Sequence, residues 1–235
     1  MNTPSLRLVG ALFLVGALLL FIPYTALSIL FDYPNILRLD PGEILTRFHA
    51  GGTPLILTWW SFAMVGLPLI GSYVLLGQRL EQKVFYARLA TTLGVIGLVA
   101  QLVGLLRWTF VVPVLAEEYV NGDEAAQAAA RAAFLSVHQY GGVALGEHVG
   151  QLFTIAWTVL MAFALQRAQL APRWMTLLGT SASVIYSVAQ LELFATVIPG
   201  VPVWDPAGFL GSTLWLVWLI LLGIRLLRAS GMNIH

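Results

Sequence analysis

The chain has 235 residues, of which 59% are hydrophobic and only 10% are charged, and its formal net charge is +1. A soluble domain carries about 25% charged residues, so this composition excludes a protein that folds as a globule in water. The near-neutral charge, without a basic patch of interleaved aromatic residues, argues against nucleic-acid binding. Cysteine is absent, which excludes disulfides, thiolate metal sites and cysteine nucleophiles.

Six apolar segments without charged side chains follow one another along the chain. Each approaches or exceeds the roughly 18–20 residues that a helix needs to cross a bilayer. Helices are required because isolated strands leave backbone polar groups unsatisfied in lipid. We therefore predict an all-α, multipass integral membrane protein: a six-helix bundle that forms one transmembrane domain over residues 1–235. The predicted spans extend several of these segments past flanking charged residues and are 8–31, 53–76, 86–113, 140–166, 174–198 and 206–228.

The first span has some features of a secretory signal peptide. Arg7 precedes the apolar run, and Ala26-Leu27-Ser28 could serve as a cleavage site. The run is long for a signal peptide, however, and it continues through Ile29-Leu30-Phe31. We therefore interpret it as a retained span.

Lysine and arginine are distributed unevenly between the two sides of the predicted bundle. With the N-terminus inside, the inside segments hold eight of the twelve basic residues. This bias predicts a cell-membrane protein with both termini in the cytoplasm. Trp108 and Trp204 are expected near the outer boundary and Trp174 near the inner one, as in an aromatic belt.

Two short amphipathic helices are predicted in the outer loops. In the first, Asp40 is a candidate N-cap, with Pro41 at the first helical position and Glu43 in the first turn. One face of this helix is apolar and should lie at the membrane interface; its residues are Ile44, Leu45 and Phe48. The second helix covers 123–137, with Asp123 as its N-cap, and should lead directly into span four.

Span four carries small residues at a strict spacing of four. Such a row lets another helix approach closely in lipid, where packing replaces the hydrophobic drive. We therefore expect this span to be central and tightly packed. The row consists of Gly142, Gly146, Gly150, Thr154, Thr158 and Ala162.

The adjacent pair Glu147-His148 inside span four is the strongest functional signal. Ionisable residues are costly in a membrane and mark functional sites or structural ion pairs. At 1.5 Å per residue, Glu147 lies about 10 Å below the outer end of its span, and Arg107 and Glu192 about 9 Å below theirs. We therefore predict a polar pocket, open to the outside, that binds a small ligand, a lipid or an ion. Its residues would be Arg107, Glu147, His148, Gln151 and Glu192.

Within this predicted pocket, Arg107 would hold an anionic group or balance the acids. Glu147 and Glu192 would bind a cation or accept protons, and His148 would act as a ligand or proton relay. His138, at the start of the span, is interpreted as a solvated interfacial histidine. No catalytic residue is assigned, and we favour a non-enzymatic protein.

Three alternatives stay open. The same residues could form an enzyme that depends on a metal ion or a haem, with His148 and Glu147 as ligands, although the metalloprotease spacing H-E-x-x-H is absent. The charges could instead form a purely structural ion-pair network. Finally, the chain could be an accessory subunit whose glycine row docks a partner membrane helix.

Three groups of residues resemble a family of small bacterial and archaeal membrane proteins catalogued as a domain of unknown function. They are the segment Leu37-Arg38-Leu39-Asp40-Pro41 with Phe48 and Gly51-Gly52, the pair Arg107-Trp108 with Pro113, and the segment from His138 to His148. The resemblance extends from about Arg7 to Leu227. It implies a multipass membrane protein and supplies no activity or catalytic residue.

Overall fold

The computed structural model describes residues 5–229, and within them it contains helices and no strands. Six of the helical segments are long and apolar enough to cross a membrane, which confirms the predicted all-α, multipass fold class. These segments are Leu6–Phe31, Pro41–Leu80, Ala87–Asn121, Glu124–Arg167, Arg173–Ala195 and Pro206–Ala229.

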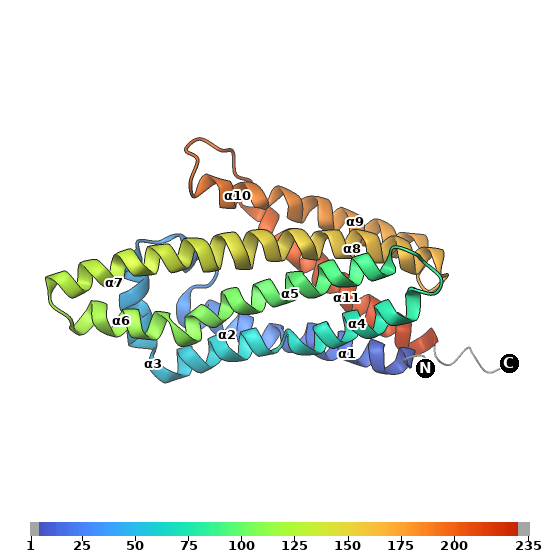
Figure 1. Cartoon of the computed structure of the whole chain (residues 1–235), viewed down its shortest axis with the longest axis horizontal. Helices are drawn as coiled ribbons and strands as arrows, with labels where there is room; N and C mark the ends of the chain where they lie inside the picture. Colours follow the sequence, from blue (N-terminus) through green and yellow to red (C-terminus); the bar gives the residue numbers. More distant parts are fainter. Residues whose placement is uncertain (1–4, 230–235) are drawn as a thin grey trace. The chain divides into compact units, whose positions relative to one another are not determined.

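Several of these long segments are built from more than one helix. The elements of the first half are α1 (Leu6–Leu19), α2 (Phe21–Phe31), the 3₁₀ helix η1 (Asn35–Arg38), α3 (Pro41–Met64), α4 (Leu67–Leu80), α5 (Ala87–Phe110) and α6 (Val112–Asn121). The second half contains α7 (Glu124–Val137), the π-helix η2 (His138–Val149), α8 (Gly150–Arg167), α9 (Arg173–Val188), α10 (Gln190–Ala195) and α11 (Pro206–Ala229). Figure 1 shows their order along the chain.

The helices gather into two compact units, and each unit is made of separate stretches of the chain. Unit 1 comprises residues 1–18, 67–99 and 148–235, and unit 2 comprises 19–66 and 100–147. One boundary falls between Glu147 and His148, so the adjacent pair that the sequence singled out is divided between the units.

Unit 2 is organised around an aromatic core. Within it α2 packs on α3, α3 on α6, and α6 on α7, and a short turn joins α6 to α7 (Figure 1). Trp59 and Trp108 stack with their ring centroids 4.8 Å apart, and Phe31 meets Trp108 edge-on at 5.6 Å. Trp108 was expected in an outer aromatic belt, and that expectation is wrong, because its side chain is buried in this core.

The first amphipathic helix begins at the predicted residue and forms the start of α3. Asp40 has an extended backbone, and its carboxylate accepts a hydrogen bond from the Gly42 amide at 2.8 Å. The helix kinks at Gly52, whose φ of 54° lies in the region that favours glycine. The apolar face was expected at the membrane interface, and that expectation is wrong, because the face is buried against the aromatic residues of the unit 2 core; its residues are Ile44, Leu45 and Phe48.

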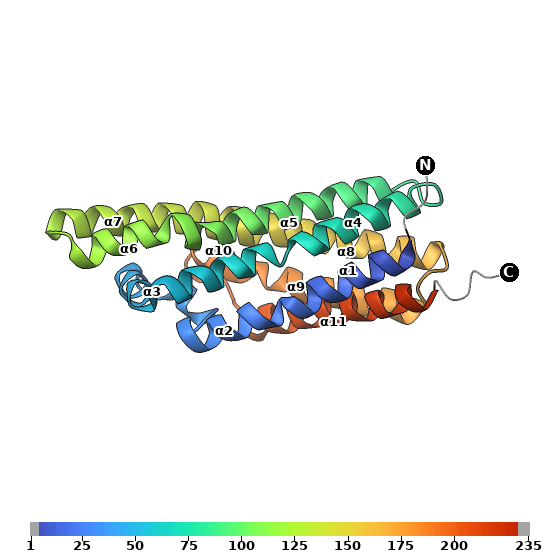
Figure 2. The same ribbon diagram turned by 90° about the horizontal axis from the view of Figure 1, so that it is seen from below.

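Unit 1 contains a second aromatic core. Here α8 and α11 both pack against α9, and Figure 2 shows α9 and α11 running side by side. Tyr73 stacks on Trp157 with a centroid distance of 3.5 Å. The backbones of α1 and α11 also approach closely, since a Cβ added at Gly10 would lie 2.7 Å from the Gly223 carbonyl oxygen. Such contact between glycines is typical of packed membrane helices.

The second amphipathic helix and the small-residue row also match the sequence predictions. Asp123 caps α7 by accepting a hydrogen bond from the Ala126 amide at 2.9 Å, and α7 continues without a break into η2 and α8. In unit 2, a Cβ added at Gly146 would lie 3.1 Å from Gly104 Cα. All six residues of the row are buried: Gly142, Gly146, Gly150, Thr154, Thr158 and Ala162.

Candidate functional site

The segment that carries the predicted site is a π-helix rather than an α-helix. It covers His138–Val149 and lies between α7 and α8. π-helical geometry is rare and is frequently found at functional sites. Glycines at 141, 142 and 146 weaken the α-helical preference of this stretch. The functional signal in the sequence and the irregular backbone therefore coincide.

Arg107 lies in α5 and is buried, with 8% of its surface exposed. Its Nη1 donates a hydrogen bond to the Gly104 carbonyl, and its Cζ lies 5.1 Å from the centroid of the Trp108 ring. Gly142 provides the room for the guanidinium, since a Cβ there would lie 2.6 Å from Arg107 Cζ. The buried Nε has no hydrogen-bond partner among the described residues.

Glu147 and Arg38 form an ion pair across 109 residues of sequence. The Arg38 Nη2 donates to Glu147 Oε2 at 2.8 Å, and the two side chains are 29% and 20% exposed. Arg107 also interacts electrostatically with Glu147, so the structure brings these two predicted residues together. The other carboxylate oxygen, Glu147 Oε1, is buried and lacks a hydrogen-bond partner within the part of the chain that is described.

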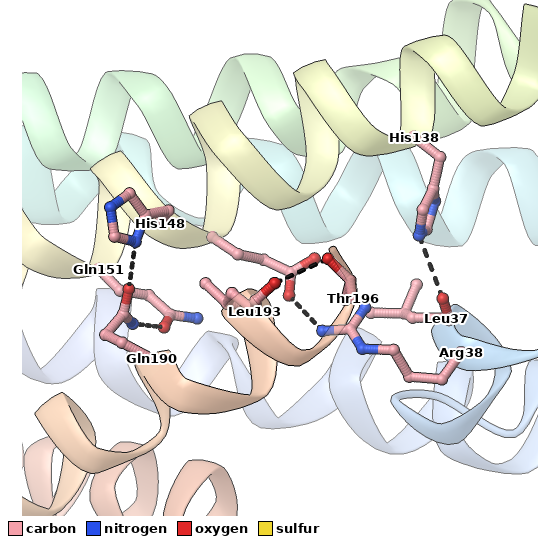
Figure 3. Close-up of polar contacts among 9 residues, drawn as sticks. Leu37, Arg38, His138, His148, Gln151, Gln190, Leu193 and Thr196 are labelled. Atoms are coloured by element: carbon pink, nitrogen blue, oxygen red, sulfur yellow. Dashed lines mark hydrogen bonds and ion pairs between the residues drawn. The ribbon is translucent and has the colours of Figure 1, made fainter. Parts of the chain in front are cut away.

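His138 is buried, with 7% exposure, so its interpretation as a solvated interfacial histidine is wrong. Its ring stacks on Phe134 at 5.2 Å and meets Trp108 edge-on at 6.1 Å. Figure 3 shows the ring pointing at the carbonyl of Leu37, with Nε2 3.1 Å from that oxygen. The second ring nitrogen, Nδ1, is buried and has no hydrogen-bond partner within residues 5–229. The charges of Arg38, Arg107 and Glu147 all act on this ring.

These four residues define the unit 2 cluster: Arg38, Arg107, His138 and Glu147. Sequence analysis did not find Arg38, because a basic residue in an outer loop usually faces water. The weak signal that could have found His138 is its place in a glycine-rich continuation of an amphipathic helix, where a ring can turn inward.

The other predicted residues belong to unit 1. There His148 Nδ1 lies 2.8 Å from Gln190 Oε1, and Gln190 Nε2 donates to Gln151 Oε1 at 2.5 Å, as Figure 3 shows. The His148 ring meets Phe194 edge-on at 5.4 Å. Glu192 lies in α10 and is partly exposed. The structure thus gathers His148 and Gln151 around Gln190, which the sequence had not assigned to the site.

The geometry gives little support for a metal centre. Within residues 5–229, no three histidine, aspartate or glutamate side chains are arranged to hold a metal ion. Glu147 and His148, the pair considered as ligands, fall in different units. His148 uses only Nδ1 in its contact with Gln190, which leaves Nε2 as the nitrogen that a haem iron would require.

Fold and site together define a multipass helical membrane protein with a partly buried, mixed-charge cluster in unit 2. The chain belongs to the family described as a domain of unknown function (DUF4386), whose sequence model matches residues 8–223. This match agrees with the resemblance noted in the sequence. No curated protein and no solved structure matches the chain.

Proposed function

We propose that this membrane protein binds a small ligand that carries an anionic group, through the unit 2 cluster. The observation that carries the proposal is a set of three buried polar atoms, none of which has a hydrogen-bond partner among the described residues. They are Arg107 Nε, His138 Nδ1 and Glu147 Oε1. The proposal describes a binding protein and not an enzyme.

Buried polar atoms without partners are costly. Leaving one unsatisfied costs about 1–3 kcal/mol, and more for a charged group. Native proteins contain few of them, and each one calls for an explanation such as a ligand, a bound ion or an ordered water. Here two of the three atoms belong to charged side chains, and the three residues interact electrostatically with one another. A ligand that reaches all three atoms would satisfy them together.

The charges of the cluster favour an anionic group on the ligand. Glu147 forms an ion pair with Arg38 and also interacts electrostatically with Arg107. Arg107 has no ion pair within the described residues, although it is more deeply buried than either of them. Since a buried cation without a direct ion pair is disfavoured, an anion beside the Arg107 guanidinium would stabilise the bound state. Arginine is also well suited to bind carboxylate and phosphate groups.

We further propose that the cluster faces the extracytoplasmic side. The support is the excess of lysine and arginine in the segments assigned to the inside, together with the depth of Arg107 and Glu147 near the outer ends of their spans. The ligand would therefore come from the outer aqueous phase or from the outer leaflet.

Native mass spectrometry of the protein, extracted from its membrane in mild detergent, tests the proposal. The wild type should retain one small molecule or lipid, and Arg107→Gln should lose it. Arg131→Gln is the matched control, because Arg131 is exposed and pairs with Asp40 at the start of α3. Equal retention by wild type and Arg107→Gln, or no retained species at all, would contradict the proposal.

A further inference from the structure

We infer that the π-helix η2 positions Glu147 in the unit 2 cluster. Its wide turns place Glu147 on the same face as His138, and an α-helical register would carry the carboxylate out of the cluster. This positioning role rests on the proposed function, since it specifies how the chain assembles that binding site. Two independent features lead to it, namely the number of residues in each turn and the packing of α5 against one of the wide turns.

The direction in which Glu147 faces, relative to His138, depends on the type of helix. The two residues are nine positions apart in η2. An α-helix has about 3.6 residues per turn, so nine residues make about 2.5 turns and would put the two side chains on opposite faces. A π-helix has about 4.4 residues per turn, so nine residues make about two full turns and return to the same face. The π register therefore directs both side chains to one side.

The contacts of the segment agree with this geometry. Gly142 lies about one π-turn from His138 and about one from Glu147, and it packs against the Arg107 guanidinium. His138 is 7% exposed and the Glu147 side chain 20%, whereas Tyr140 is 77% exposed. The charges of Arg107 and Glu147 both act on the His138 ring. One face of η2, formed by His138, Gly142 and Glu147, is thus turned towards Arg107.

The helix α5 packs directly against one wide turn of η2. Gly141 and Gly146 are five residues apart, which is the spacing of the hydrogen bond that defines a π-helix. A Cβ added at Gly104 would lie 2.9 Å from the Gly141 carbonyl oxygen and 2.7 Å from Gly146 Cα. Both are backbone atoms, which cannot move aside as the end of a flexible side chain can. Because Gly104 has no side chain, α5 can lie on this turn and bring Arg107 against Gly142.

The π-helix is equivalent to an α-helix that contains two extra residues. Its 12 residues make about 2.7 turns. Ten residues of α-helix make about 2.8 turns, so an α-helix two residues shorter has almost the same total rotation. After deletion of Ala144 and Leu145, seven positions would separate His138 from Glu147. Seven residues make about 1.9 turns of an α-helix, and the two side chains would share a face again.

Deletion of Ala144 and Leu145 from the full-length protein tests the positioning role. The first readout is the coupling between Arg38→Gln and Glu147→Gln, measured by denaturation in detergent with and without the deletion. This readout requires no ligand. We expect the deletion variant to keep the coupling of the wild type. In native mass spectrometry, it should also retain the small molecule or lipid that co-purifies with the wild type.

A matched control removes Ala132 and Ala133, which are exposed in the α-helix α7. Two residues make slightly more than half a turn of an α-helix, and here no π-turn can absorb the change. This deletion should therefore turn Arg131 away from Asp40, with which it forms an ion pair, and lower the thermal midpoint.

An exchange of two residues reports the register in a chain of unchanged length. The variant combines Leu145→Glu with Glu147→Leu. Position 145 is seven residues from His138, which is about 1.9 turns of an α-helix but about 1.6 turns of a π-helix. In the π register the moved carboxylate faces away from the cluster. Arg38→Gln should then lower the thermal midpoint less in the exchange variant than in the wild type.

The outcomes separate the positioning role from ligand binding. The positioning role is overturned if the deletion variant unfolds, if it loses the coupling to Arg38 or the retained species, or if Arg38→Gln has its full effect in the exchange variant. The proposed function then stands as long as the wild type retains a species that Arg107→Gln loses. If the coupling survives the deletion but the wild type retains no species, the positioning of Glu147 holds and the proposed function is overturned.

Discussion

Gly142 lies directly against the guanidinium of Arg107, where a larger residue would displace that buried cation. A Cβ at Gly142 would be 2.6 Å from Arg107 Cζ, closer than real Cβ contacts allow. The neighbouring Gly141 has more room, since its nearest contact would be Arg107 Cδ at 3.8 Å. A methyl group therefore fits at position 141, whereas at position 142 it requires Arg107 to move.

This difference predicts opposite outcomes for two one-carbon changes. Gly142→Ala should lower the free energy of unfolding by ~1–3 kcal/mol, because the guanidinium must move within a packed core. Gly141→Ala should leave stability nearly unchanged or raise it slightly, since alanine favours a helical backbone. Denaturation of the purified protein in detergent measures both variants. Equal stabilities for the two would show that Arg107 moves aside without cost.

The ion pair between Arg38 and Glu147 should be coupled more strongly than a surface pair. A double-mutant cycle with Arg38→Gln and Glu147→Gln should give a coupling energy of ~1–3 kcal/mol, because the Glu147 side chain is only 20% exposed and the Arg38 side chain 29%. The control cycle uses Arg88 and Glu81, which lie 3.3 Å apart with Arg88 81% exposed. That pair should give ~0.2–1 kcal/mol. Similar coupling energies in both cycles would mean that the partial burial of Glu147 does not strengthen its ion pair with Arg38.

Sequence reasoning succeeded where a local pattern determines the structure. The apolar face of Ile44, Leu45 and Phe48, the cap at Asp123 and the buried small-residue row of span four each follow from periodicity or capping chemistry. The depths calculated for Arg107 and Glu147 also predicted that the two residues lie near each other, since the rise per residue in a helix is nearly constant.

The parts that could not be predicted depend on long-range packing. The partner of Glu147 is Arg38, 109 residues away, and no local pattern connects them. Trp108 was expected at the membrane boundary, but the rings of unit 2 enclose it. The π-helix could not be read from hydropathy, because α- and π-helices in an apolar run have similar compositions. The burial of His138 was missed because it depends on tertiary contacts, with the Phe134 ring and with the carbonyl of Leu37.

The cap at the start of α3 predicts how stability depends on pH. The amide of Gly42, and after it the guanidinium of Arg131, lower the pKa of the Asp40 carboxyl. A lowered pKa in the folded state stabilises the protein above the unfolded pKa, which is about 3.9 for aspartate. This contribution is therefore lost as the pH falls from about 4 through the lower folded value. Asp40→Asn keeps a capping oxygen but removes the charge.

The thermal midpoint of Asp40→Asn should accordingly lie below that of the wild type at neutral pH, and the two should converge at acidic pH. Arg131→Gln should make the difference smaller, because one source of the lowered pKa is gone. A difference between wild type and Asp40→Asn that stays constant from neutral to acidic pH would show that the charge of Asp40 does not contribute.

The absence of native cysteine makes the predicted orientation directly testable. Ala128→Cys, exposed in α7, should react with a membrane-impermeant maleimide added to intact cells. Lys83→Cys, exposed in the turn between α4 and α5, should react only after the membrane is opened. The wild-type chain is the blank in both assays. The reverse pattern of labelling would place the termini outside and turn the unit 2 cluster towards the cytoplasm.

The two histidines of the π-helix should adopt opposite neutral tautomers. His138 faces a carbonyl with Nε2 and must be protonated there. Gln190 donates its amide hydrogen to Gln151, so its oxygen faces His148, which must then carry the proton on Nδ1. Nitrogen-15 NMR of histidine-labelled protein, with His49 and His235 replaced by glutamine, should resolve one ring of each kind. Gln190→Leu should release His148 from its tautomer and leave His138 unchanged. Two rings of the same tautomer in the otherwise unchanged protein would mean that the amides of Gln190 and Gln151 point the other way.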